Sequence, residues 1–115
     1  KVFEALQKGL SGSVTGAANP MPELLIAMQS KYRLSVSKTE SMQRCLDVWN
    51  RFRNASGYFE IPLVKAAMSA RIDCFPEHVR PPLTPVPTEE LDRIRGIVGN
   101  CLSDFKLWIN GVRLD

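Results

Sequence analysis

The segment Gly12-Ser-Val-Thr-Gly-Ala-Ala-Asn19 constrains this chain more than any other part of it. Residues 11–17 combine two glycines with small and β-branched side chains, which is typical of a strand buried on both faces of a parallel sheet. Glycine in a strand also allows a ligand to come close to the backbone. Because a strand satisfies its amide and carbonyl groups through neighbouring strands, this segment predicts a sheet around it.

The rest of the chain carries apolar residues at helical spacing. One such face is formed by Met42, Cys45, Leu46, Trp49 and Phe52. Prolines at positions 76, 81, 82, 85 and 87 exclude a helix from the connection over 72–87. The pattern predicts helices over residues 2–8, 21–33, 38–55, 62–71 and 88–108.

Residues that cap or stop helices mark several of these boundaries. Gly9 is expected to end the first helix, since glycine readily adopts the left-handed conformation, and Asn54, Ser56 and Gly57 are expected to stop the helix over 38–55. Asn19 is expected to cap the helix over 21–33, and Ser37 with Glu40 forms a capping box for the next helix. One strand among five helices has no partner within the chain, so either the segment is not a strand or its neighbours lie outside these 115 residues.

Charge and composition narrow the classes of function. The 15 basic and 12 acidic residues give a net charge of +3, and the basic residues are scattered rather than gathered in a run. A nucleic-acid surface requires a concentrated basic face, so we expect no nucleic-acid partner. The cluster Arg51-Phe-Arg53 is expected to be a solvated helix edge rather than a phosphate contact. No apolar run reaches the roughly 20 residues of a membrane span, so we expect no membrane partner either.

Three widely spaced cysteines indicate a reducing, cytoplasmic setting. Cys45 and Cys101 fall on apolar helix faces and are expected to be small buried hydrophobic residues. The single histidine, His78, lies in the proline-rich connection without a second ligand nearby, so no metal site is expected.

No complete catalytic constellation is present in the sequence. The glycines at positions 9, 12 and 16 do not have the spacing of a dinucleotide-binding loop, and no Ser, His and Asp residues are ordered as a triad. Lys65 lies on an alanine-rich helix face, where it is expected to extend its ammonium group to solvent rather than act as a nucleophile.

A set of short motifs resembles the dihydrodipicolinate synthase and N-acetylneuraminate lyase family in order and spacing. Residues 12–19 resemble the eighth strand of that family's barrel. The match continues through Pro22-Glu-Leu-Leu25, Ile61-Pro-Leu-Val-Lys65, Val79-Arg-Pro-Pro-Leu83 and Pro87-Thr-Glu-Glu-Leu91.

The resemblance implies an α/β fold, namely the C-terminal part of a (β/α)8 TIM barrel followed by a helical region. Residues 1–35 would supply the end of the seventh helix, the eighth strand and the eighth helix, and residues 36–115 the C-terminal helical region. A whole barrel needs about 250 residues. The chain would therefore join a missing N-terminal part of the same protein, and the 115 residues alone should be inactive.

The family implies a class I aldolase or lyase that needs no cofactor. A lysine on the sixth strand forms a Schiff base with pyruvate or another 2-keto acid, and a tyrosine transfers protons. Neither residue lies in this chain under the resemblance. Members are cytoplasmic and often homotetramers, so a homo-oligomer is expected.

The resemblance places three substrate-binding residues at the end of the eighth strand. The backbone of Val14 would line the keto-acid pocket, and Thr15 and Gly16 would lie at its rim. Sialic acid lyases carry a serine where Gly16 stands, and this difference disfavours that substrate. The other substrates of the family remain open.

An alternative from a different class of function is a small all-α interaction module without catalysis. Residues 11–17 would then be an irregular loop, and the Trp49/Phe52 and Leu91/Ile94 faces would form a groove for a partner. The state of these apolar faces distinguishes the two hypotheses.

Overall fold

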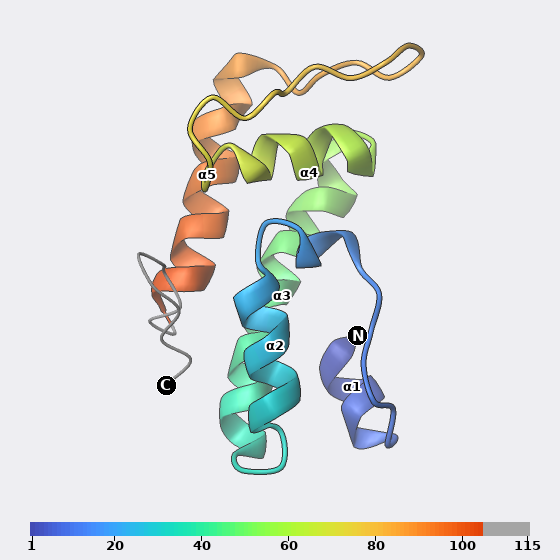
Figure 1. Ribbon diagram of the computed structural model, residues 1–115, viewed down its shortest axis with the longest axis vertical. Coiled ribbons are helices and arrows are strands. Elements are labelled where there is room, and N and C mark those ends of the chain that lie inside the picture. Colours follow the sequence, from blue (N-terminus) through green and yellow to red (C-terminus); the bar gives the residue numbers. More distant parts are fainter. Residues whose placement is uncertain (105–115) are drawn as a thin grey trace.

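Five α-helices and one short 3-10 turn account for the regular structure of residues 1–104, the part of the chain that the computed structural model describes (Figure 1). The elements are α1 (Val2–Gln7), η1 (Gly16–Ala18), α2 (Pro22–Lys31), α3 (Val36–Ser56), α4 (Glu60–Met68) and α5 (Thr88–Ser103).

The long helix α3 is the centre of the fold. Helix α2 lies against it along one side, and α5 and the short α1 contact it elsewhere, while α4 packs on α5 (Figure 1). The side chains between these helices form one apolar core. Its largest fully buried members are Met21, Leu24, Met28, Met42, Trp49, Leu63, Ile94, Val98 and Leu102.

Helix α3 begins and ends at residues suited to those positions. Ser35 is its N-cap and accepts a hydrogen bond from the Lys38 amide, at 3.3 Å. The predicted capping box at Ser37 was therefore misplaced by two residues: Ser37 lies in the first turn, since the chain enters the helix earlier than the serine–glutamate spacing suggests. Gly57 ends the helix with φ of +75°, because the left-handed region costs glycine little. Asn54 and Ser56, predicted to stop the helix with Gly57, still lie in its last turn, since only glycine adopts this conformation without strain.

Helix α2 starts from Met21, with Pro22 as its first residue. Asn19, predicted to cap this helix, instead ends the turn η1, where its side-chain amide donates to the Gly16 carbonyl. Glu23 in the first turn is buried and accepts two hydrogen bonds from the Arg71 guanidinium, at 2.5 and 2.7 Å. This bidentate pair raises the pKa of Arg71 and joins the start of α2 to the turn that follows α4.

Helices α4 and α5 form an angled pair. Ala66 and Ala67 are buried on α4, and such small residues allow close approach to α5. The helix predicted over 62–71 begins two residues earlier, at Glu60, and ends at Met68. The helix predicted over 88–108 begins at Thr88, as expected. Its predicted end, with Trp108 and Ile109, lies outside the described residues.

The connection over 72–87 contains no helix, as its prolines predict. It projects from the helices as a long arm before returning to the start of α5 (Figure 1). Two contacts hold its near end: Lys65 donates to the His78 carbonyl at 2.8 Å, and Arg95 pairs with Glu77 at 3.8 Å.

The strand predicted over 11–17 is not formed. Residues 10–15 are irregular, and residues 16–18 form η1. The physical reason is that a strand exists through its hydrogen bonds to a neighbour, and residues 1–104 contain no second strand. The described part of the chain is mostly helical, in agreement with the coarse prediction for this region.

Candidate functional site

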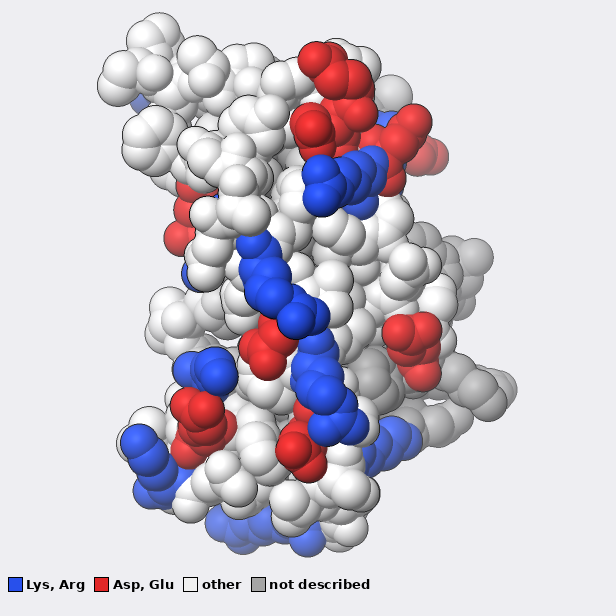
Figure 2. Space-filling view, turned by 180° about the vertical axis from the view of Figure 1, so that it is seen from behind, with Lys and Arg blue, Asp and Glu red and all other residues white. Residues whose placement is uncertain are grey.

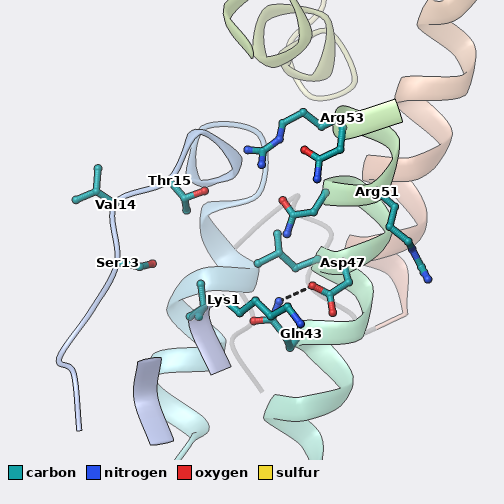
Figure 3. Close-up of a pocket in the computed structure, with 12 residues that line it drawn as sticks. Lys1, Ser13, Val14, Thr15, Gln43, Asp47, Arg51 and Arg53 are labelled. Carbon is teal, nitrogen blue, oxygen red and sulfur yellow. Dashed lines mark hydrogen bonds between the residues drawn. The ribbon is translucent and has the colours of Figure 1, made fainter. Parts of the chain in front are cut away.

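Residues 10–15 run along the outside of the helices in an extended conformation. Their side chains do not join the core that the helices share. Thr15 has φ of −152° and ψ of 145°, which are strand angles. In Figure 3 the side chains of Ser13 and Thr15 point toward α3 and that of Val14 points the opposite way. This alternation is the period-2 geometry of a strand, although no strand partner is present within residues 1–104.

The backbone of this segment has few partners. The Ser11 carbonyl accepts a hydrogen bond from the side-chain amide of Gln29. Among residues 1–104, the backbone groups of residues 12–14 make no hydrogen bond with another backbone group, and Val14 is fully exposed. An extended stretch with free amides and carbonyls resembles the edge of a sheet, a natural template for strand pairing.

Cavities separate the segment from the helices. The larger, of about 610 Å³, lies between residues 13–15 and α3, with the start of α1 at its margin (Figure 3). A smaller one of about 210 Å³ lies between residues 12–13 and helices α1 and α2. The segment therefore stands away from the core that the helices share.

Polar side chains of α3 form the wall of the larger cavity opposite Thr15. Gln43 is fixed in place: it donates to Asp47 Oδ1 at 2.8 Å and accepts from the Phe3 amide at 2.9 Å. Such a wall offers cations and amides to a ligand rich in carboxylate or hydroxyl oxygens. The polar residues of this wall are Gln43, Asp47, Asn50, Arg51, Arg53 and Asn54.

Arg53 is the cation directed at the predicted binding segment. It points from α3 toward the turn that follows Thr15, whereas Arg51 points away from residues 13–15 (Figure 3). Its Nη1 lies 3.3 Å from Glu60 Oε1, so the first residue of α4 holds the guanidinium in place.

Gly16 lies directly under the Glu60 side chain. A Cβ atom added at Gly16 would overlap Glu60 Oε1, so any larger residue requires the carboxylate to move. The absence of a side chain at Gly16 therefore allows α4 to approach the end of the extended segment. The same Glu60 carboxylate binds Arg53, so it connects Gly16 with that guanidinium.

The sequence-predicted site residues come together only in part. Val14 and Thr15 line the larger cavity, whereas Gly16 contacts Glu60 beside it. Sequence reasoning interpreted Arg53 as part of a solvated helix edge rather than as a binding residue, and it missed Glu60. Their pairing depends on the sharp turn at Gly57, and no motif marks two charges seven residues apart across a helix end.

Other sequence expectations have simple structural outcomes. The Lys65 ammonium donates a hydrogen bond to the His78 carbonyl, and His78 is exposed. On the face opposite that of Figure 1, Lys and Arg side chains run in an oblique stripe with Asp and Glu side chains beside it (Figure 2). Ion pairs such as Arg44–Glu40, at 3.6 Å, show the same mixing of charge.

Comparison with protein-family models, with curated proteins and with solved structures finds no match to this chain. Among the described residues, no group of three or more His, Cys, Asp or Glu side chains is arranged to hold a metal ion. No helix within residues 1–104 has the length and apolar character needed to cross a membrane.

Proposed function

We propose that this chain is the C-terminal portion of a class I aldolase or lyase of the dihydrodipicolinate synthase type. The enzyme would make or break a carbon–carbon bond beside a 2-keto acid such as pyruvate. The observation that carries the proposal is the extended segment over residues 10–15, with its free backbone groups and strand-like alternation. Such a segment is expected of a barrel strand separated from its neighbours.

The contribution of this chain to the reaction would be at the substrate rim. The C-terminal ends of barrel strands face the catalytic mouth, and here that end is Val14 and Thr15. Val14 points its side chain away from the cavity, so its contribution would come from the backbone. Thr15 would offer a hydroxyl, and Gly16 would leave space for the rest of the substrate.

The Schiff base itself would form on a lysine of the N-terminal part. Attack of its amine on the keto carbon expels water and gives an iminium ion. In the cleavage direction, the bond between the α and β carbons breaks, its electron pair converts the iminium ion to an enamine, and the β-hydroxyl loses its proton to leave as an aldehyde. The residues described above would bind and orient the substrate during this step. Reaction at the lysine therefore requires both parts of the protein.

The apolar faces of the helices do not decide between the two hypotheses. The Trp49/Phe52 face of α3 and the Leu91/Ile94 face of α5 are buried in the common core. The helical region of a barrel enzyme and a self-contained helical module would both bury them. The large apolar side chains that remain exposed are spread over the described residues, and they are Leu10, Val14, Ile26, Leu34, Val36, Val48, Phe59, Ile61 and Ile72.

Reductive trapping tests the proposal directly. The full-length protein is incubated with pyruvate and sodium borohydride, and we expect a stable adduct on one lysine in the intact-mass spectrum. Omission of pyruvate is the first control. The isolated 115-residue chain is the second, and it should give no adduct because the reacting lysine is not among its residues. A full-length protein that remains unmodified would overturn the proposal.

A second measurement separates the two classes of function. The isolated chain should bind a hydrophobic dye and self-associate, because its extended segment and nearby apolar side chains are uncovered. A monomeric chain that binds no dye would favour a self-contained module.

A further inference from the structure

Two cysteines meet at the contact between α3 and α5. Cys45 is half-buried on α3, and Cys101 is buried on α5. The Cys101 thiol lies 3.3 Å from the Cys45 carbonyl oxygen, to which it donates a hydrogen bond. The residues are 56 positions apart in sequence, so the packing of the two helices brings them together.

The environment makes the two sulfurs unequal. Interaction with the neighbouring Cys101 thiol lowers the pKa of the Cys45 thiol, because a nearby S–H group favours the thiolate. Interaction with Cys45, together with burial, raises the pKa of the Cys101 thiol. Cys45 is also the more accessible of the two. An accessible sulfur that ionises first, next to a second thiol, is the arrangement of a reactive and a resolving cysteine.

The third cysteine provides an internal comparison. Cys74 is exposed on the connection between α4 and α5, with φ of +58°. It lies outside the contact between α3 and α5. Accessibility alone would make Cys74 the first residue to be oxidised, whereas proximity favours Cys45 and Cys101.

We propose that Cys45 and Cys101 are an oxidisable thiol pair that forms a disulfide between α3 and α5 on reaction with a hydroperoxide. The Cys45 thiolate attacks one peroxide oxygen, the O–O bond breaks, and the sulfur becomes a sulfenic acid as hydroxide (or an alkoxide) leaves. Cys101 sulfur then attacks the Cys45 sulfur and displaces its oxygen as water, its own proton being lost. Overall, two thiols lose two electrons and two protons to the peroxide. The proposal does not depend on the proposed aldolase function.

The crosslink would act on the candidate site through α3. The polar wall of the larger cavity belongs to that helix, with Gln43 and Asp47 two residues to either side of Cys45. A disulfide would fix this wall relative to α5. It would also restrict the unfolded chain, and we expect the melting temperature of the oxidised protein to rise by roughly 5–20 °C.

The test uses the protein in a Cys74→Ser background, so that only the proposed pair remains. Hydrogen peroxide is added, the protein is denatured, free thiols are alkylated, and the products are read by intact-mass and peptide mass spectrometry. We expect loss of both alkylation sites, independent of protein concentration, and a crosslinked peptide pair that contains Cys45 and Cys101. The same treatment of urea-unfolded wild-type protein should give mixed pairings that include Cys74.

A second measurement covers the case in which a variant folds poorly. Wild-type protein is oxidised in the presence of dimedone, which captures sulfenic acids; the adduct should appear on Cys45 and should increase in Cys101→Ser. Two thiols that stay reduced, dimers as the only disulfide product, or dimedone capture at Cys101 instead of Cys45 would each overturn the proposal.

Discussion

The extended segment over residues 10–15 and the helices α3 to α5 differ in how far they satisfy their backbone groups and bury their side chains. The helices form hydrogen bonds between their own backbone groups, and they bury Trp49, Leu63 and Ile94 completely. The segment leaves the backbone of residues 12–14 without backbone partners and Val14 fully exposed. Cavities lie between it and the helices on which it would otherwise pack.

The difference follows from how the two kinds of structure are stabilised. A helix makes its hydrogen bonds locally, so it needs neighbours only to cover its apolar face. A strand makes its hydrogen bonds to other strands and has none when it is alone. The helical region therefore folds from the residues present, whereas the segment has strand geometry without strand partners.

The sharpest test of this contrast replaces one buried and one exposed residue of similar size. Ile94→Ala should lower the free energy of unfolding by about 3 kcal/mol, since it leaves a cavity at the centre of the core. Val14→Ala should change it by less than about 0.5 kcal/mol, because the side chain contacts solvent. Urea titration followed by circular dichroism measures both. Equal effects would mean that the segment belongs to the cooperative unit.

The Glu23–Arg71 pair tests the connection between the N-terminal elements and the bundle. Glu23→Gln should destabilise the protein by about 2 kcal/mol, because the partly buried guanidinium loses its counter-charge and one of its acceptors. Glu40→Gln is the matched control: its pair with Arg44 is exposed and should contribute less than about 0.5 kcal/mol. Thermal melts of both variants provide the comparison, and a neutral Glu23→Gln would show that α2 and α4 are held by apolar contacts alone.

The two left-handed glycines give the smallest expected effect. Gly57→Ala should cost about 1 kcal/mol, since alanine is strained at φ of +75° although its Cβ meets no other atom. Gly9→Ala carries the same strain at φ of +81°. It follows the six-residue α1, whose one buried side chain is Leu6, so local fraying should absorb most of the cost. Global stability should change by less than half as much as for Gly57→Ala. Equal losses in urea titrations would place α1 within the bundle's cooperative unit.

Helices were the predictable part of this fold. Apolar spacing located the five helices of residues 1–104, and Gly9 was correctly assigned as a left-handed stop. Gly57 was correctly named among the residues that end α3. Boundaries that depend on caps were less accurate: Ser35 rather than Ser37 caps α3, because several serines near the helix start satisfy the same local pattern. The strand was wrong for a non-local reason, since its formation depends on partners that the sequence of the segment does not contain.

The sequence predicted the part of the candidate site that consecutive residues form. It did not predict the contacts between residues that are distant in the sequence. The family resemblance singled out Val14 and Thr15, and both line the larger cavity. Arg53 and Glu60 reach the same region only because the chain reverses at Gly57 and brings the start of α4 over Gly16. The packing of the helices forms this cluster, and no rule of residue spacing within one sequence predicts it.

The proline-rich arm over 72–87 has a consequence for how α4 and α5 find each other. Each proline fixes one backbone torsion before folding as well as after it, so the connection samples fewer shapes when the helices are apart. The entropic penalty for joining its two ends is thereby reduced. A connection that lies almost entirely in solvent can in this way favour the pairing of the two helices that it links.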